Sequence, residues 1–361
     1  MVVSPTFIFA KEEAPPKNSM ERRQRAELMQ FFLGNPQEAV LPTSPIAVEL
    51  YNRAVEYFRK SDYALARQML NESLGHDDKN SFAHELLGDI SSAEHKLDEA
   101  AEHYGAAYRL RPEEGIRKKI RKLKEELAVE GKLSQIETEY FVLRYEKDSV
   151  PGESFAYKDL LSKVYEQVSK DLDYNFHEKM VVLIYGEEDF NRITQMPHWV
   201  TGLYDGKVRM PVRLQGAGDS EMEALATHEM THAFIAALSA HRAPAWVNEG
   251  LAQVEENKIR PIDLLVFDAA VTTRTLLPLD QLMIPQEAVA HHDPLWANLF
   301  YQQSYHLVQY LVNQYGIFKM RKLLEAFAAE KNSDEAVRSV YGVSIEELEK
   351  AWRATFTPLS V

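Results

Sequence analysis

A segment from about Glu221 to Ser239 is apolar around nearly its whole helical circumference, yet it carries His228, Glu229 and His232. A helix that is apolar all round belongs in the interior of a folded domain. Ionisable side chains lose their hydration there, and partners must offset that loss. The segment therefore predicts a buried helix whose polar residues form a site.

The three polar residues form a His-Glu-x-x-His motif. Residues four apart lie on one face of a helix, so His228 and His232 can bind one metal ion together. Glu229 lies one position further round, where it can reach a water molecule on the metal but not easily the metal itself. This is the arrangement that a zinc hydrolase needs. Chance produces so short a motif in roughly a few per cent of sequences with this histidine content, so its context has to support it.

Glu249 is the candidate third ligand, since a catalytic zinc usually takes three protein ligands and leaves a fourth position for water. Sixteen residues separate it from His232, which is enough for the end of one helix, a turn and the start of a second, antiparallel helix. A surface glutamate favoured at a helix start by the helix dipole is the alternative. The His-Glu-x-x-His motif at this distance favours the ligand.

Composition excludes several other kinds of site. The formal net charge of -14 argues against a general nucleic-acid binder, because the phosphate backbone would be repelled. The chain has no cysteine, so disulfides, cysteine-ligated zinc and thiol nucleophiles are excluded. The sequence contains no apolar stretch long enough for a membrane span.

An internal repeat of 34 residues runs from about 47 to 114 and becomes visible when Ala47 is aligned with Ser81. Small residues recur where two helices would cross closely, and larger residues where they fill the next groove. The second unit resembles the tetratricopeptide repeat, and the first fits its pattern more loosely. The residues that carry the resemblance are Leu87-Gly88, Ala100, Tyr104, Ala107 and Pro112.

A basic segment follows the repeats, with Ile116, Ile120, Leu123 and Leu127 at helical spacing. A nucleic-acid patch and a solvated capping helix are both consistent with its charge. We favour the capping helix, because Glu125 and Glu126 follow at once and two repeats need a neighbour to cover their apolar face.

After Gly131 the pattern changes to that of an α+β domain. We predict strands at 139–145 and 179–185, a helix from Tyr157 to Leu172, and a turn at 203–207. A short strand follows from Val208 to Val212, and Pro211 makes it an edge strand because proline cannot donate to a ladder. From Ser220 the chain is helical, and a capping box of Ser344 with Glu347 starts the last helix.

Three domains are therefore expected: an N-terminal extension over 1–44, a repeat domain with its capping helix over 45–132, and the α+β domain over 133–361. The extension contains a short predicted helix, Glu21 to Leu33. Its apolar start is either the stub of a secretory signal or a tail without structure, and we favour the tail. The protein is accordingly either cytoplasmic or, if the stub is a truncated signal, exported to the periplasm.

His-Glu-Met-Thr-His and Trp-Val-Asn-Glu-Gly-Leu-Ala together resemble the gluzincin metallopeptidases, a group that includes thermolysin and the aminopeptidase N-like enzymes. With the repeats ahead of it, the domain resembles the bacterial peptidase MA-like proteins over roughly 137–357. The resemblance implies a zincin-like fold with a small sheet and helices, and one Zn2+ per chain held by His228, His232 and Glu249. It also implies that Glu229 is the general base and acid, and that the strand near Val208 pairs with an extended substrate.

Two further positions complete the predicted site. Thermolysin-type enzymes carry an aspartate four residues after the ligand glutamate, and this chain has Gln253 there, which brings no negative charge to the first histidine. A tyrosine opens a later helix in related proteins and stabilises the oxyanion; Tyr301 is the closest match. Tyr305, His291 and His292 lie nearby in the sequence.

The function expected is a zinc-dependent peptidase, and we favour an endopeptidase because the sequence has no recognisable acidic motif for a free amine. Its partners are a peptide or protein substrate and a protein bound by the repeats. Two alternatives stay open: a catalytically weak metal-binding scaffold, motivated by Gln253, and a zinc hydrolase of a non-peptide bond such as one in cell-wall material.

Overall fold

The computed structural model describes residues 44–59, 62–130, 133–146, 154–194, 202–212, 219–284, 289, 292–329 and 332–356. The chain divides into two compact units, Met1–Phe58 with Asp62–Lys132 and Arg59–Ser61 with Leu133–Val361. The predicted helix from Glu21 to Leu33 lies outside the described residues, as does all of the predicted extension before Ser44.

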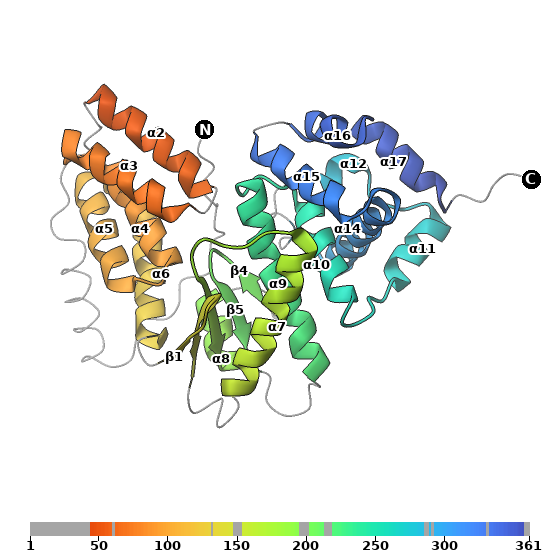
Figure 1. The fold of residues 1–361 in the computed structure, drawn as a ribbon, viewed down its shortest axis with the longest axis horizontal. Coiled ribbons are helices and arrows are strands. Elements are labelled where there is room, and N and C mark those ends of the chain that lie inside the picture. The colour runs from red at the N-terminus through yellow and green to blue at the C-terminus, as the bar shows by residue number, and fades with distance from the viewer. Residues whose placement is uncertain are drawn as a thin grey trace, which may run out of the picture. The chain divides into compact units, whose positions relative to one another are not determined.

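The first unit consists of helices in the described part of the chain (Figure 1). They are α2 (Pro45–Arg59), α3 (Tyr63–His76), α4 (Ser81–Ala93), α5 (Leu97–Leu110) and α6 (Glu114–Glu130). Asn80 caps α4 by accepting from the backbone N–H groups of Phe82 and Ala83. The all-helical prediction for this segment is confirmed, while the identification of its helix pairs as tetratricopeptide repeats stays a prediction.

Gly88 explains how closely α4 and α5 pack. A Cβ atom at this position would lie 2.6 Å from Cε1 of Tyr104, so a side chain larger than hydrogen does not fit. Tyr104 is buried, and its hydroxyl donates to Asp89 at 2.8 Å. The small and large positions identified in the repeat therefore do meet across a helix pair.

The basic helix α6 packs against the other helices of this unit. Ile116, Ile120 and Leu123 are buried in the same cluster as the apolar residues of α5. Lys119 lies 2.8 Å from Asp89 and 2.7 Å from Glu85, both on α4. This use of an apolar stripe and a lysine for packing supports the capping-helix interpretation.

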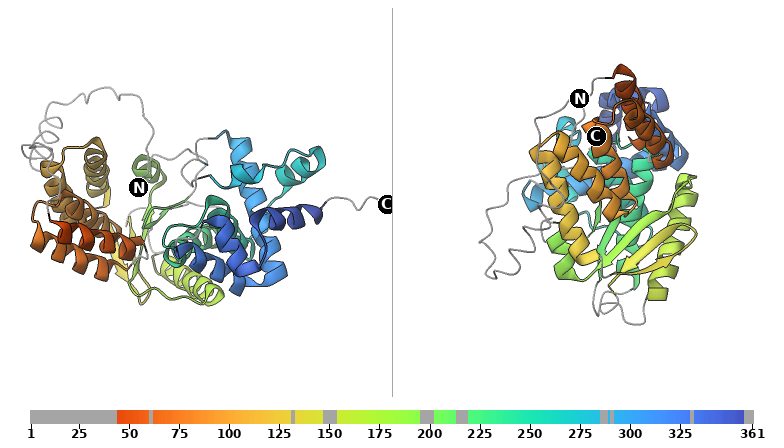
Figure 2. Two further views of the ribbon diagram at one scale, coloured as in Figure 1. Left: turned by 90° about the horizontal axis from the view of Figure 1, so that it is seen from above. Right: turned by 90° about the vertical axis from the view of Figure 1, so that its left-hand side faces the viewer.

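The second unit is built on a five-stranded mixed sheet in the order β1-β2-β3-β5-β4 (Figure 2, right). The strands are β1 (Ser134–Glu137), β2 (Phe141–Tyr145), β3 (Met180–Tyr185), β4 (Leu203–Tyr204) and β5 (Val208–Pro211). The pairs β2–β3 and β3–β5 are parallel, and the two outer pairs are antiparallel. Helices α7 (Ser154–Leu172) and α8 (Glu187–Thr194) connect the parallel strands.

One face of the sheet forms the core with α7 and α9 (Asp219–Ser239) (Figure 1). Alternate residues of the strands point to that face because side chains in a strand have a period of two. Leu143, Val182 and Met210 are examples, each 0% exposed. The remaining helices complete the unit: α10 (Ala245–Asn257), α11 (Leu265–Thr273), α12 (Leu279–Leu282), α14 (Pro294–Tyr315), α15 (Ile317–Ala328), α16 (Ser333–Tyr341) and α17 (Ile345–Ala354).

The predicted edge strand from Val208 to Val212 is not the edge of the sheet, because β5 lies between β3 and β4. The prediction missed β4, which was expected to be part of a turn. β4 pairs only with Val208 and Arg209, so Pro211 lies beyond the end of that pairing. The N–H of Val212 donates to Tyr185 of β3, so the nitrogen of Pro211 points to the opposite side, where no ladder bond is lost.

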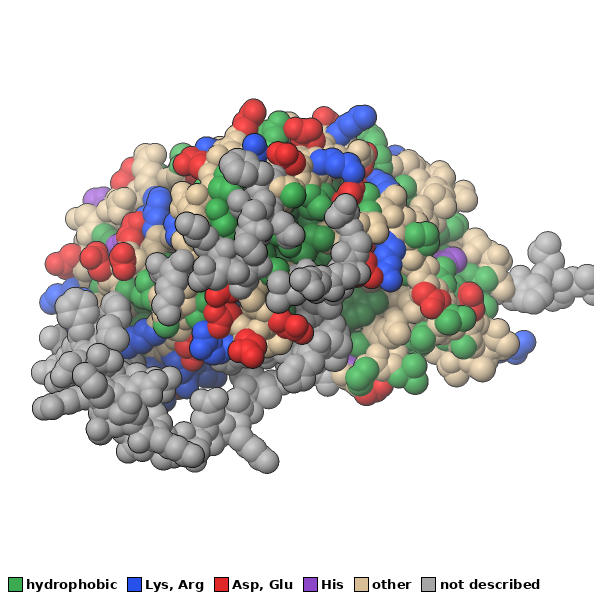
Figure 3. All heavy atoms as spheres, turned by 90° about the horizontal axis from the view of Figure 1, so that it is seen from below, with side chains coloured by type: hydrophobic (Ala, Val, Ile, Leu, Met, Phe, Trp, Pro, Cys, Tyr) green, Lys and Arg blue, Asp and Glu red, His purple; other side chains and the backbone are tan. Residues whose placement is uncertain are grey.

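One further prediction for this unit is confirmed. The last helix begins with the predicted capping box, in which Ser344 and Glu347 each accept from the other's backbone. No helix among the described residues is long and apolar enough to cross a membrane. Acidic and basic side chains are intermixed on the molecular face that Figure 3 shows.

Candidate metal centre

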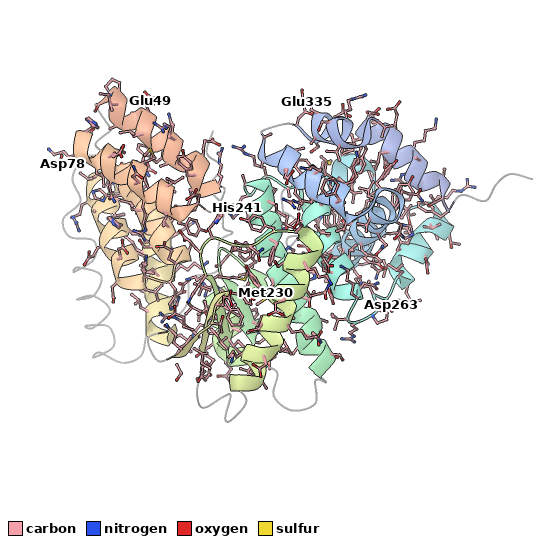
Figure 4. All side chains as sticks on the ribbon, in the orientation of Figure 1. Glu49, Asp78, Met230, His241, Asp263 and Glu335 are labelled. Carbon is pink, nitrogen blue, oxygen red and sulfur yellow. The ribbon has the colours of Figure 1, made fainter. Side chains whose placement is uncertain are left out.

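Helix α9 presents the motif residues from inside the domain. Figure 4 labels Met230 midway along this helix, and its side chain is 0% exposed. Hydroxyl groups on α9 are satisfied within the helix: Thr227 donates to the carbonyl of Glu223, and Thr231 to that of Thr227. The two threonines therefore need no partner outside the helix, whereas the histidines and Glu229 do.

A tight turn leads from α9 into α10. Ala240 and His241 adopt left-handed backbone angles, with φ values of 50° and 56°. Such angles are uncommon for residues other than glycine, so tertiary packing must hold them. Pro244 then precedes the first turn of α10, where its lack of an N–H has no cost. The turn brings the start of α10 back alongside the middle of α9.

His228, His232 and Glu249 come together as predicted. Nε2 of His228 lies 3.5 Å, and Nε2 of His232 lies 3.8 Å, from Oε2 of Glu249. One ligand atom from each of the three residues lies within 4.8 Å of the others. Four-coordinate zinc with bonds of about 2.0–2.2 Å places its ligand atoms roughly 3.3–3.6 Å apart, so this donor set fits the ion with small movements.

The second nitrogen of each histidine ring has a hydrogen-bond partner on α10. Nδ1 of His228 lies 2.9 Å from Oε2 of Glu256, and Nδ1 of His232 lies 3.1 Å from Oδ1 of Asn248. Carboxylate and amide oxygens accept hydrogen bonds, so both rings carry their proton on Nδ1. Nε2 of each ring then faces Glu249, and it can bind a metal ion once any proton shared with that carboxylate has left.

Glu256 was not among the predicted site residues, because the thermolysin-type spacing places the supporting carboxylate at position 253. Gln253 is buried in α10, but the carboxylate that reaches His228 comes from one turn later. Glu256 follows Glu249 by seven residues, or two helical turns, so both carboxylates project from one side of α10. The seven-residue spacing between Glu249 and Glu256 is the sequence signal that could have identified Glu256. The negative charge that Gln253 does not bring to the first histidine is therefore supplied by Glu256.

The two histidines differ in their proton affinity. Burial lowers the pKa of His228, but hydrogen bonds with Glu249 and Glu256 outweigh it and raise the pKa well above its usual value. Burial lowers the pKa of His232 to about 4, with Glu249 opposing the shift. His228 faces two carboxylates, whereas His232 faces one carboxylate and a neutral amide. A bound cation would therefore displace a proton mainly from His228.

Glu229 lies beside these ligands and is only 5% exposed. Burial raises the pKa of its carboxyl group to about 8, with His228 lowering it and Glu249 and Glu256 raising it. A divalent cation held by the three ligands would favour the ionised form. Glu229 is thus a carboxylate whose protonation is governed by the charge at the centre.

Tyr301 approaches the same centre from α14. Burial raises the pKa of its hydroxyl, and the charges of Glu249 and Glu229 raise it further. The phenol therefore lies within electrostatic reach of both carboxylates and stays a neutral hydrogen-bond donor. Tyr305, one turn later, is buried, and His292 stacks on Trp296 with ring centroids 3.7 Å apart. His291 lies outside the described residues.

Comparison with known proteins agrees with this geometry. Residues 218–358 match the family model described as Peptidase MA superfamily. The matched segment begins just before α9 and includes the whole ligand set and Tyr301. No curated protein and no solved structure matched the chain. The second unit therefore contains a domain of the metallopeptidase type.

Proposed function

We propose that the protein is a zinc-dependent peptidase whose ion is held by His228, His232 and Glu249. The observation that carries the proposal is the orientation of the two imidazoles. Both direct Nε2 toward Glu249, 3.5 and 3.8 Å away, while Nδ1 of each is held by an oxygen of α10. A histidine pair that only filled space would not need both rings oriented in this way.

The donor set favours zinc over other common divalent ions. Two imidazoles and one carboxylate suit zinc, whereas calcium and magnesium prefer oxygen ligands alone. Three protein ligands leave one position for substrate or water, as catalytic zinc sites do. When bound, the ion would supply Lewis-acid chemistry by polarising a peptide carbonyl and acidifying a water molecule.

The chain's own residues divide the remaining steps of hydrolysis. Glu229 accepts a proton from the attacking water on its carboxylate and then delivers that proton to the leaving amine. Tyr301 donates its hydroxyl hydrogen to the oxygen that becomes negative as the carbonyl is attacked. Glu256 and Asn248 keep the two imidazoles oriented. The buried surroundings strengthen each of these interactions, because little water screens them.

The finer parts of the proposal are the mode of cleavage and the role of the first unit. The absence of a recognisable acidic motif for a free amino terminus favours an endopeptidase. The helix pairs of the first unit would bind a partner or substrate protein, as tetratricopeptide repeats do. A protein bound there would be presented to the peptidase as a tethered substrate at high effective concentration.

Two alternatives remain open to experiment. The first alternative is a metal-binding scaffold with little turnover, and the neutral Gln253 is the reason to consider it. Glu256 weakens that reason because it gives His228 a charged partner. Glu229 also has no use in a purely structural site. A zinc hydrolase of a non-peptide bond would use the same centre and differ only in its substrate.

Metal analysis and cleavage profiling together test the proposal. Purified protein should contain about one zinc per chain, and it should cleave peptides from a mixed library in a chelator-sensitive way. Glu229→Gln should keep the zinc and lose cleavage. Absence of zinc, or wild-type cleavage by Glu229→Gln, would show the proposal to be wrong; cleavage only of glycan or other non-peptide bonds would favour the last alternative.

A further inference from the structure

Gly202 lies directly against the side chain of Glu229. It immediately precedes β4, one of the two edge strands, and is buried. A Cβ atom built at Gly202 would lie 2.6 Å from Cγ and 2.7 Å from Cδ of Glu229, and closer still to Oε1. Carbon atoms in ordinary contact are about 3.5–4.0 Å apart. Any side chain at 202 would therefore occupy space that the Glu229 carboxyl group now fills.

Gly202 differs from Gly250 of the same unit in the kind of atoms that a Cβ atom would contact. The three nearest atoms to a Cβ at Gly202 all belong to the end of one flexible side chain. At Gly250, by contrast, a Cβ would lie 2.8 Å from the carbonyl carbon of Ser304, which is backbone of α14. A methyl group at 250 must push two helices apart, whereas a methyl group at 202 has only to turn a carboxylate aside.

Two parts of the structure therefore limit where the Glu229 carboxylate can lie. Helix α9 fixes its Cα one residue after His228, and the backbone at Gly202 closes the side toward β4. A general base has to lie within hydrogen-bond reach of the proton that it abstracts, so a displacement of about 1 Å is enough to lower the rate greatly.

We propose that Gly202 is a positioning residue for Glu229: the missing side chain provides the space in which the carboxylate is held for proton transfer. The inference rests on the proposed function, since it concerns the general base of that reaction. The three atoms nearest a Cβ at Gly202 belong to Glu229 and to none of the three proposed ligands. Gly202 acts through Glu229 alone.

Gly202→Ala tests the inference. We expect kcat to fall by roughly 100-fold while KM, zinc affinity and the melting temperature stay close to wild type. A crystal structure of the variant should show the Glu229 carboxylate displaced by about 1 Å, the distance that restores normal contact. Gly75→Ala and Gly115→Ala are matched controls, because nothing lies within 4 Å of a Cβ at either position; both should cleave like wild type.

A double-mutant cycle separates positioning from general damage. Aspartate is one methylene shorter than glutamate, so Glu229→Asp makes room beside residue 202. The cost of Gly202→Ala in kcat should therefore be at least about tenfold smaller in the Glu229→Asp background than in wild type. An equal cost in both backgrounds would overturn the inference.

The outcomes also distinguish this inference from the proposed function. Wild-type cleavage by Glu229→Gln removes the proposed function itself. If Glu229→Gln is inactive but Gly202→Ala cleaves like wild type, only the positioning role is wrong. Loss of zinc or a clearly lowered melting temperature in Gly202→Ala would equally overturn it, because Gly202 would then serve packing or metal binding.

Discussion

Oε2 of Glu256 lies 2.9 Å from Nδ1 of His228, seven residues after the carboxylate that lies 3.5 Å from Nε2 of the same ring. One imidazole is therefore held between two carboxylates of a single helix. The outer carboxylate orients the ring and makes its metal-facing nitrogen more basic. Metal affinity should depend on this outer contact almost as strongly as on a ligand.

Replacing Glu256 with glutamine should weaken zinc binding by about 10- to 100-fold. The amide retains the shape of the side chain but removes the charge that stabilises the Nδ1 proton. Competition with a coloured chelator measures the change in affinity. A fall of less than about threefold would show that Glu256 does not support the ligand.

Gln253→Ala provides the contrasting measurement, since residue 253 is where a thermolysin-type enzyme carries its supporting acid. We expect zinc affinity to change by less than about threefold, because the charged partner of His228 comes from Glu256. A larger loss at 253 than at 256 would reverse the roles that the geometry assigns.

Tyr301→Phe should lower kcat by about 10- to 100-fold, somewhat below the loss measured for other oxyanion donors, with a much smaller change in KM. The hydroxyl acts on charge that develops only during the reaction, and burial beside Glu249 and Glu229 keeps it protonated. Steady-state kinetics on a cleaved peptide measures the effect. Tyr305→Phe, one turn further along α14, serves as the control and should retain nearly full activity.

Gly250→Ala should destabilise the second unit by about 1–3 kcal/mol. A Cβ at this position would lie 2.5 Å from Cγ2 of Val308 and even nearer the carbonyl oxygen of Ser304. Thermal or chemical unfolding checks the loss. Gly75→Ala lies in α3 with open space around it and should instead stabilise its helix by about 0.5–1 kcal/mol.

The first unit should lose stability as the pH falls from 6.5 toward 4. Burial lowers the pKa of His84 to about 4, and the positive charges of His103 and Arg109 shift it in the same direction. Above pH 6.5 the ring is neutral in both states; between 6.5 and 4 the unfolded chain takes up a proton that the folded chain does not. This contribution is therefore present at high pH and is lost on acidification, by about 1–2 kcal/mol after allowance for solvent screening.

His84→Gln isolates that contribution, because glutamine has no proton to take up in this range. The free energy of unfolding of the variant should vary less between pH 6.5 and 4 than that of wild type. Parallel slopes for wild type and the variant would contradict the assignment.

The residues of the candidate metal centre could be predicted because their chemistry is local. His228 and His232 are four residues apart on one helix, and Glu249 follows after a turn, so spacing alone brings them near each other. The fold class was equally accessible, since α7 and β3 have clear helical and strand patterns. Burial of α9 followed directly from its apolar composition.

The remaining features depend on contacts that spacing does not reveal. β4 has only two residues, too few for a recognisable strand pattern, so the edge of the sheet was assigned to β5. Glu256 was not predicted, because the thermolysin-type spacing places the supporting residue at Gln253. The approach of Gly202 to Glu229 joins two segments that no periodicity links.

The turn through Ala240 and His241 determines how much of the chain is needed to form the ligand set. All three ligands lie in one continuous helix-turn-helix segment, so the site needs no distant part of the chain to define its spacing. A bound ion would link the two helices across a short loop and would stabilise the folded hairpin. Because the loop is short, the link restricts the unfolded chain only a little. Insertions elsewhere in the unit can therefore alter what reaches the centre and leave its geometry intact.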